Sequence, residues 1–151
     1  MVIRGINKAL LDQCEERTSQ KDESLKIYTE NDMSIARDAA MRMAQSCEFT
    51  MAASTSLATA VSELARNILH YAMEGTIILS RITEKGRRGI KVTALDNGPG
   101  IANIDEILAG GYASKTGMGL GLIGTKRLMD YFQVDSAPGK GTRVTAIKYG
   151  R

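Results

Sequence analysis

The sequence has few of the residues that build metal or disulfide sites. It contains one histidine, His70, and two cysteines, Cys14 and Cys47, which form no CxxC pair. Zinc fingers, iron–sulfur clusters and disulfide scaffolds all need several such ligands or paired cysteines. These three classes are therefore excluded, and the low cysteine usage indicates a reducing, cytoplasmic location.

Long apolar runs and aromatic side chains are also scarce. No run approaches the ~20 apolar residues that cross a bilayer, and residues 1–20 contain no continuous apolar segment of the signal-peptide type. Aromatic residues make up 5% of the chain, and the 20 basic and 17 acidic residues are mixed along it. We therefore expect neither a membrane nor a nucleic-acid partner.

What is present fits one globular domain. The chain has 151 residues, of which 43% are hydrophobic and 25% charged. This length suits a single domain, and these proportions exclude a disordered or fibrous protein. Residues 1–23 are polar and are expected to form an N-terminal appendage of unknown role, whereas 24–151 are expected to form the domain.

The first half of the domain predicts a strand at 25–29 and then two helices. The first helix is expected to be capped by Asn31 or Asp32, and its small and apolar positions recur at helical spacing: Ile35, Ala36, Ala39, Met43 and Cys47. The second helix is expected to begin near Ala53 and to end at Gly75. It carries one apolar stripe, made of Leu57, Val61, Leu64 and Ile68.

The second half predicts mainly strands. Two β-rich runs at 76–83 and 90–96 flank a basic loop, which is typical of a hairpin. A short helix at 104–108, a loop at 109–119, a helix at 121–132 and strands at 132–136 and 142–150 follow. This order predicts an α/β (α+β) two-layer sandwich whose sheet is mostly antiparallel.

Two polar residues stand one turn apart beside the apolar stripe of the second helix. Glu63 and Asn67 are ~40° apart around the helix axis, on a flank where a ligand could lie between helix and sheet. A carboxylate and an amide there can accept a proton and bind a metal ion. Two solvated polar side chains on a helix flank would give the same pattern.

A tight turn follows the strand at 90–96. In Asp96-Asn97-Gly98-Pro99-Gly100, two glycines and a proline turn the chain sharply and leave the Asp96 carboxylate at the rim of the sheet. An acceptor-only group at this rim suits a planar donor such as the exocyclic amine of adenine. An ordinary turn without a ligand explains the segment equally well.

A glycine-rich segment, GMGLGL at 117–122, leads into the helix predicted at 121–132. Such an entry exposes backbone N–H groups at the positive end of the helix dipole, which is an anion site. A Rossmann fingerprint is rejected because a polar loop, not a strand, precedes it, and no P-loop pattern is present. Gly139-Lys140-Gly141-Thr142 by itself indicates only a turn.

In order and spacing, the segments ELARN, DNGPG, GMGLGL and GKGT together resemble the N box and three glycine boxes of the GHKL, or Bergerat-fold, ATPase/kinase superfamily. The resemblance covers roughly residues 24–149 and implies helices packed on one face of a mixed, mostly antiparallel sheet. Within the superfamily, SELARNI, DNGPGI and GLGLIGTKRLMD resemble the anti-sigma factor serine/threonine kinases, and most of all the switch kinases of the bacterial stressosome.

The resemblance implies ATP and Mg²⁺ as cofactors and a role for each matching residue. Asn67 matches the asparagine that coordinates Mg²⁺, and Glu63 matches the carboxylate proposed as base for the attacking hydroxyl. Asp96 matches the acceptor of the adenine amine, Gly98 and Gly100 allow the base to approach, and Thr142 lies near the adenine. The phosphate-wrapping box matches Gly117, Met118, Gly119, Leu120, Gly121 and Leu122.

The resemblance also implies protein partners. It predicts a serine/threonine kinase that phosphorylates STAS-domain antagonist proteins, activates a PP2C-type phosphatase and so regulates a stress or sigma-factor pathway by partner switching. Two alternatives remain open: an anti-sigma factor that binds a sigma factor directly, and a non-catalytic nucleotide-binding docking switch. Residues 1–23 precede the matched region, and the resemblance says nothing about them.

Overall fold

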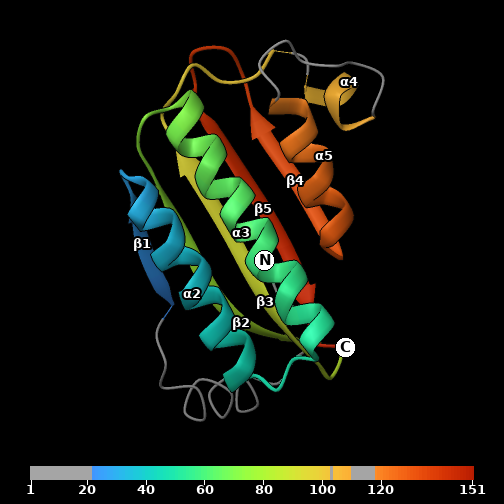
Figure 1. Ribbon diagram of the computed structural model, residues 1–151. Coiled ribbons are helices and arrows are strands. Elements are labelled where there is room, and N and C mark those ends of the chain that lie inside the picture. Colours follow the sequence, from blue (N-terminus) through green and yellow to red (C-terminus); the bar gives the residue numbers. More distant parts are fainter. Residues whose placement is uncertain (1–21, 103, 110–117) are drawn as a thin grey trace, which may run out of the picture.

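A five-stranded sheet with helices on one face makes up the described part of the chain (Figure 1). This computed structural model describes residues 22–102, 104–109 and 118–151. The elements, in chain order, are β1 (Glu23–Ile27), α2 (Glu30–Ser46), α3 (Met51–Tyr71), β2 (Gly75–Glu84), β3 (Arg87–Asp96), α4 (Ile104–Leu108), α5 (Met118–Leu128), β4 (Tyr131–Ser136) and β5 (Thr142–Tyr149).

The predicted two-layer sandwich is confirmed. The strand order is β1-β2-β3-β5-β4, and α2, α3 and α5 lie side by side on one face (Figure 1). All four strand pairings in the described part of the chain are antiparallel, so no parallel pairing of a mixed sheet is seen there.

The core lies between the sheet and the helices. The predicted stripe of α3 is confirmed, since Leu57, Val61, Leu64 and Ile68 are each at most 2% exposed. They pack with Ile77, Leu79, Ile90, Val92, Val144 and Ala146 of the sheet in one cluster. α2 adds alanines at positions 36, 39, 40 and 44, and these small side chains let α2 lie close to α3.

The N-terminus of α2 corrects the predicted cap. Thr29, not Asn31 or Asp32, is the N-cap: its Oγ1 accepts a hydrogen bond from the Asp32 N–H at 3.2 Å. The Asp32 carboxylate in turn accepts from the N–H of Thr29 at 3.0 Å, which completes a capping box. Of the small and apolar positions that recur at helical spacing, Ala36, Ala39 and Met43 are buried, whereas Ile35 is 45% exposed.

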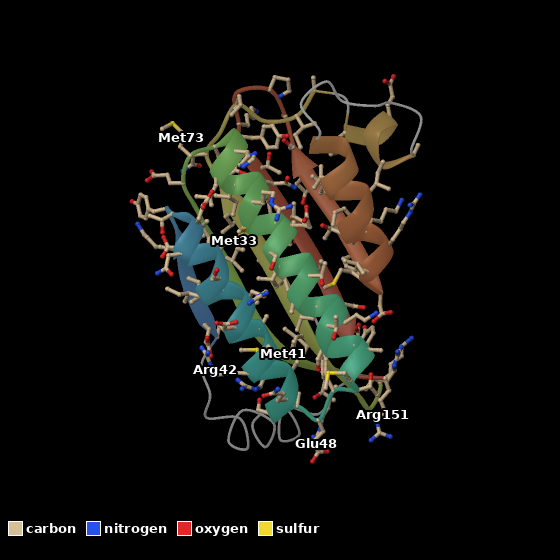
Figure 2. All side chains as sticks on the ribbon, in the orientation of Figure 1. Met33, Met41, Arg42, Glu48, Met73 and Arg151 are labelled. Carbon is tan, nitrogen blue, oxygen red and sulfur yellow. The ribbon has the colours of Figure 1, made fainter. Side chains whose placement is uncertain are left out.

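The ends of α3 and α5 also differ from the prediction. α3 begins at Met51 and ends at Tyr71. Gly75, expected to end it, is the first residue of β2, and the exposed Met73 at φ +70° makes the reversal (Figure 2). α5 begins at Met118, three residues earlier than expected.

The strands differ from the prediction at their ends as well. Tyr131, expected in the helix before β4, is the first residue of β4, and Phe132, placed in both predictions, belongs to the strand. The β2–β3 hairpin turns through Lys85 and Gly86, both at positive φ, so its strands are longer than predicted. β1 begins at Glu23, one residue inside the segment expected to be an appendage.

We predict that Thr29→Ala lowers the free energy of unfolding by about 1 kcal/mol, because one N–H of the first turn of α2 loses its acceptor. Ser34→Ala, on the exposed side of the same helix, is the matched control and should change stability by less than about 0.5 kcal/mol. Urea unfolding measures both, and equal losses would contradict the capping role of Thr29.

Candidate functional site

One row of residues crosses the end of the sheet. The register pairs Gly75 with Asp96, Asp96 with Thr142, and Thr142 with Ser136. Residues that face each other across antiparallel strands lie on the same face of the sheet. Because Ala94 and Val144, two residues further along their strands, are buried under the helices, this row faces the helices as well.

Asp96 is the charged member of this row. Its Oδ1 accepts a hydrogen bond from the N–H of Gly98 at 2.9 Å. Burial raises the pKa of the Asp96 carboxyl above its ordinary value, although backbone N–H groups of Gly98 and Thr142 act in the opposite direction. The site therefore holds a partly buried carboxylate that a hydrogen-bond donor would stabilise.

The glycines after Asp96 are needed for close packing. A Cβ on Gly98 would lie 2.8 Å from Cβ of Ala72, at the end of α3. Gly100 has φ +77°, and a Cβ there would collide with the carbonyl oxygen of Ala137. The turn after β3 is thus held between α3 and the β4–β5 turn, with Gly139 N–H donating to the Pro99 carbonyl at 2.7 Å.

Ser136 connects these turns, and the sequence analysis did not identify it. Its hydroxyl contacts the N–H of Ile101, the carbonyl oxygen of Gly141 and the hydroxyl of Thr142 at 2.8–2.9 Å. Ser136 is the last residue of β4 and lies in a segment without a motif. Only its register opposite Thr142 reveals it, so no local sequence signal could have found it.

The second group of polar residues lies on α3. Glu63 Oε1 accepts a hydrogen bond from Nη1 of Arg66 at 2.9 Å, in an ion pair that the sequence analysis missed although its i, i+3 spacing is visible there. Within the described part of the chain, Nδ2 of Asn67 is buried and has no hydrogen-bond partner. An unpaired buried amide is costly, and a bound ligand would satisfy it.

α5 approaches this group at a glycine. A Cβ placed on Gly121 would lie 3.2 Å from Oδ1 of Asn67 and 3.4 Å from Oε2 of Glu63. Gly121 therefore leaves the space above both side chains open. A Cβ on Gly124, one turn later, would meet no atom within 4 Å.

The predicted phosphate box coincides with the N-terminus of α5. Gly117 lies outside the described residues, and Met118, Gly119 and Leu120 form the first turn of the helix. N–H groups of a first helical turn lack intrahelical acceptors and attract anions. Leu122 is 2% exposed and lies beside Asn67 and Asp96 in the lining of one cavity.

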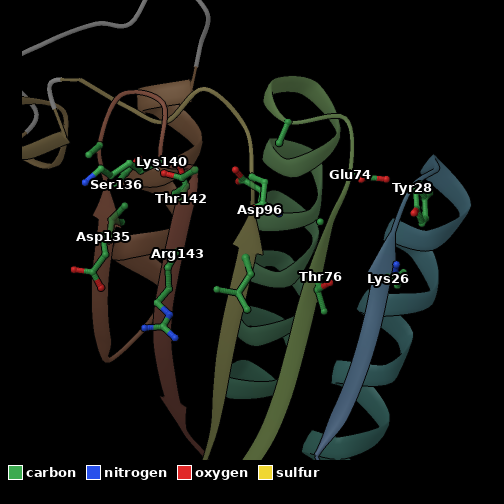
Figure 3. A pocket seen from close by; sticks show the side chains of 17 residues that line it. Lys26, Tyr28, Glu74, Thr76, Asp96, Asp135, Ser136, Lys140, Thr142 and Arg143 are labelled. Carbon is green, nitrogen blue, oxygen red and sulfur yellow. Dashed lines mark hydrogen bonds between the residues drawn. The ribbon is translucent and has the colours of Figure 1, made fainter.

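Two hollows meet at the row of Asp96 and Thr142. A cavity of about 30 Å³ under the helices is lined by Asn67, Asp96, Gly100, Leu122 and Thr142 together with apolar neighbours. An open groove of about 990 Å³ lies at the same end of the sheet (Figure 3). The groove touches Asp96 and Thr142 but neither Glu63 nor Asn67. Five of the predicted residues therefore line the cavity, whereas Glu63, Gly98 and Gly121 do not.

The cavity holds no more than about one water molecule. A purine could enter only if the segments around it moved apart. Among residues 22–102, 104–109 and 118–151, no group of three or more histidine, cysteine, aspartate or glutamate side chains is placed to hold a metal ion. A metal ion at Asn67 would therefore need ligands from a substrate and water, which is how Mg²⁺ commonly binds with phosphates.

Residues 52–149 match the family described as histidine kinase-, DNA gyrase B-, and HSP90-like ATPase. The chain is 40% identical over 127 residues to the serine/threonine-protein kinase RsbT of Bacillus subtilis. The alignment covers 84% of this chain and 96% of that protein. It is 35% identical over 136 residues to an anti-sigma F factor of Clostridium kluyveri, and this alignment covers 84% of this chain and 94% of that protein.

Solved structures match at lower identity. A chain of the SiaB–SiaC complex from Pseudomonas aeruginosa matches with a TM-score of 0.53 at 12% identity, over 97% of this chain and 99% of that one. The mycobacterial sensor histidine kinase MprB matches with a TM-score of 0.51 at 18% identity, over 87% of this chain and 99% of that one. These two matches show a shared fold.

None of the helices in the part of the chain that the structure describes has the length and apolarity needed to span a bilayer.

We predict that Gly121→Ala weakens binding of Mg²⁺–nucleotide by about tenfold or more, because the new methyl group occupies the space beside Asn67 and Glu63. Gly124→Ala is the matched control: it makes the same change in the same helix, meets no neighbour, and should stabilise α5 by up to about 1 kcal/mol. Calorimetry of both variants tests this, and equal nucleotide affinities would contradict the role of Gly121.

We predict that Asp96→Asn loses about tenfold or more in nucleotide affinity without losing stability. The Oδ1 of the new asparagine can still accept the hydrogen bond from the Gly98 N–H. Its NH₂ group then faces the exocyclic amine of the base, and two donors cannot bond to each other. Because burial raises the pKa of Asp96, its stabilising contribution is present below the unfolded pKa and is lost as the pH rises through the folded pKa.

Asp96→Asn should therefore melt at the same or a higher temperature than the wild type at pH 7, with a weaker pH dependence between the two pKa values. Calorimetric affinity and thermal melts at several pH values check both claims. A folded variant with wild-type affinity would contradict the assignment of Asp96 to the base.

Proposed function

The chain belongs to the family of histidine kinase-, DNA gyrase B- and HSP90-like ATPases, and from this premise we propose that it is an ATP- and Mg²⁺-dependent protein serine/threonine kinase. Its relatives include a serine/threonine kinase and an anti-sigma factor, which supports a partner-switching regulator. We propose STAS-domain antagonist proteins as its substrates in a bacterial stress or sigma-factor pathway in the cytoplasm.

The observation that carries this proposal is the convergence of α3 and α5. Glu63 and Asn67 face Gly121 in the second turn of α5, and Asn67 shares a cavity with Asp96 and Thr142. Asn67 is therefore close to Asp96, through the shared cavity, and to α5, through Gly121. We infer that Asp96 would bind the base of a nucleotide and that Asn67 and the N-terminus of α5 would bind its phosphates.

Adenine would bind at the Asp96 end, where the carboxylate accepts from the exocyclic amine. The phosphates would bind near the N–H groups of residues 118–120. Oδ1 of Asn67 would hold Mg²⁺ together with phosphate oxygens and water, and its unpartnered Nδ2 would donate to a phosphate oxygen. A bound ion would neutralise negative charge on the phosphates.

Glu63 is proposed to assist the transfer itself. The partner's hydroxyl oxygen bonds to the γ-phosphorus, the bond from that phosphorus to the leaving ADP oxygen breaks, and the hydroxyl proton passes to Glu63. Oε1 is engaged by Arg66 and Oε2 faces Gly121, so Oε2 is the oxygen available for this proton. Arg66 would hold the carboxylate in this orientation.

The similarity to an anti-sigma F factor favours a second candidate, direct binding of a sigma factor. Transfer of labelled phosphate from ATP to a purified STAS-domain protein, with and without Mg²⁺, tests the kinase proposal. Transfer that requires Mg²⁺ supports it. Nucleotide binding without transfer contradicts it and favours a non-catalytic docking switch, whereas capture of a sigma factor favours the anti-sigma factor.

Activation of a PP2C-type phosphatase would complete the partner switch. We propose that the phosphorylated partner releases the kinase, which then binds and activates the phosphatase. Addition of the purified chain to such a phosphatase should raise the rate at which a phosphorylated substrate loses phosphate. An unchanged rate would restrict the function to phosphorylation.

We predict that Glu63→Gln binds ATP with an affinity within about threefold of the wild type but transfers phosphate roughly 10²–10⁴-fold more slowly, because the amide cannot take a proton. Glu48→Gln is the matched control, since Glu48 also pairs with an arginine, Arg88, but precedes α3 at the end of the molecule away from Met73 (Figure 2). Single-turnover transfer at saturating ATP and partner measures the effect. A rate within a few fold of the wild type would contradict a role of Glu63 in transfer.

A further inference from the structure

The hydroxyl of Ser136 makes three hydrogen bonds. The N–H of Ile101 donates to it at 2.8 Å, the carbonyl oxygen of Gly141 accepts from it at 2.9 Å, and the Thr142 hydroxyl lies 2.9 Å away. A serine hydroxyl has one proton and two acceptor lone pairs. Three contacts therefore use its whole hydrogen-bonding capacity.

Counting protons decides the direction of the third bond. The carbonyl oxygen of Gly141 can only accept, so it takes the proton of Ser136. The Thr142 hydroxyl must then donate its own proton to Ser136. The reverse direction would leave two acceptor oxygens, those of Ser136 and Gly141, in contact without a proton between them, which costs free energy.

This direction leaves Thr142 Oγ1 with acceptor lone pairs alone. Its register partner is Asp96, and both residues line the cavity under the helices and the open groove at the end of the sheet (Figure 3). The ionised carboxylate of Asp96 is also an acceptor. The site therefore presents two adjacent acceptors, and the group that complements two acceptors is an amine with two hydrogens.

We propose that Ser136 determines the base specificity of the site, by holding the proton of Thr142 away from the ligand so that an amino group at purine C6 is accepted and a carbonyl is rejected. The inference rests on the proposed binding of a purine nucleotide next to Asp96 and does not depend on phosphoryl transfer. Ser136 is thus a positioning residue that acts through Thr142.

The test compares ADP with IDP, which carries a carbonyl in place of the C6 amine. Calorimetry of the full chain with Mg²⁺ gives the ratio of the Kd for IDP to the Kd for ADP. In Ser136→Ala the Thr142 hydroxyl is free to turn its proton toward the ligand. The ratio should fall by about tenfold, which is what one hydrogen bond typically contributes to an equilibrium constant.

Thr142→Val should reduce the ratio similarly, and the double variant should have the same ratio as Thr142→Val alone, because Ser136 acts through Thr142. Ser136→Thr keeps a hydroxyl and should keep the wild-type ratio. If Ser136→Ala does not fold, Thr142→Val remains as the test, because an unchanged ratio there would also overturn the proposal. Thr145→Val, on the same strand but the opposite face, is the matched control for Thr142→Val.

A ratio in Ser136→Ala within twofold of the wild type would overturn the proposal, as would a further fall from Thr142→Val to the double variant. A role of Ser136 in stability alone would lower the melting temperature and leave the ratio unchanged. Failure of the wild type to bind ADP would overturn this inference together with the nucleotide site. Failure to transfer phosphate, with the ratio as expected, would contradict the proposed kinase activity alone.

Discussion

The antiparallel register at one end of the sheet is the constraint on which the rest of the site depends. It places Gly75, Asp96, Thr142 and Ser136 in one row across four strands, although they are separated by up to 67 positions in the sequence. A slip of one residue in any pairing would turn that strand's member of the row away from the helices. The buried aliphatic residues of the same strands oppose such a slip, so the hydrophobic core also holds the polar site in register.

Close packing around this row explains the glycines at its edge. Gly75 begins β2 where a Cβ would lie 2.5 Å from the carbonyl oxygen of Leu95, and Gly141 has φ +73° against the backbone of Asp96. Together with Gly98 and Gly100, these residues allow three turns and the end of α3 to meet at Asp96. The turns then supply backbone N–H groups to the Asp96 carboxylate, while their proximity shields it from water and raises its pKa.

The contact of α3 with α5 imposes a different requirement. Both helices cover the core, yet the packing leaves the amide Nδ2 of Asn67 buried without a partner in the described residues. An unsatisfied buried donor is destabilising by about 1–3 kcal/mol. A fold selected only for stability would replace it, so its presence beside Gly121 and Glu63 supports a site that is completed when a ligand binds.

The sequence by itself determined the class of the fold and most of the elements, because helical and strand periodicity are local patterns. The stripe from Leu57 to Ile68 and the short helix at 104–108 follow from such patterns. Glu63, Asn67 and Asp96 became candidates only because the order and spacing of their motifs resemble those of a known superfamily. Element ends were less accurate: α5 begins three residues earlier than predicted, and the N-cap Thr29 is defined by hydrogen bonds that only the folded chain shows. Tertiary structure alone decided which residues meet: the approach of Gly121 to Asn67 and Glu63, and the bond between Ser136 and Thr142. These contacts arise from helix packing and strand register, which join distant segments and leave no periodic signal in the chain.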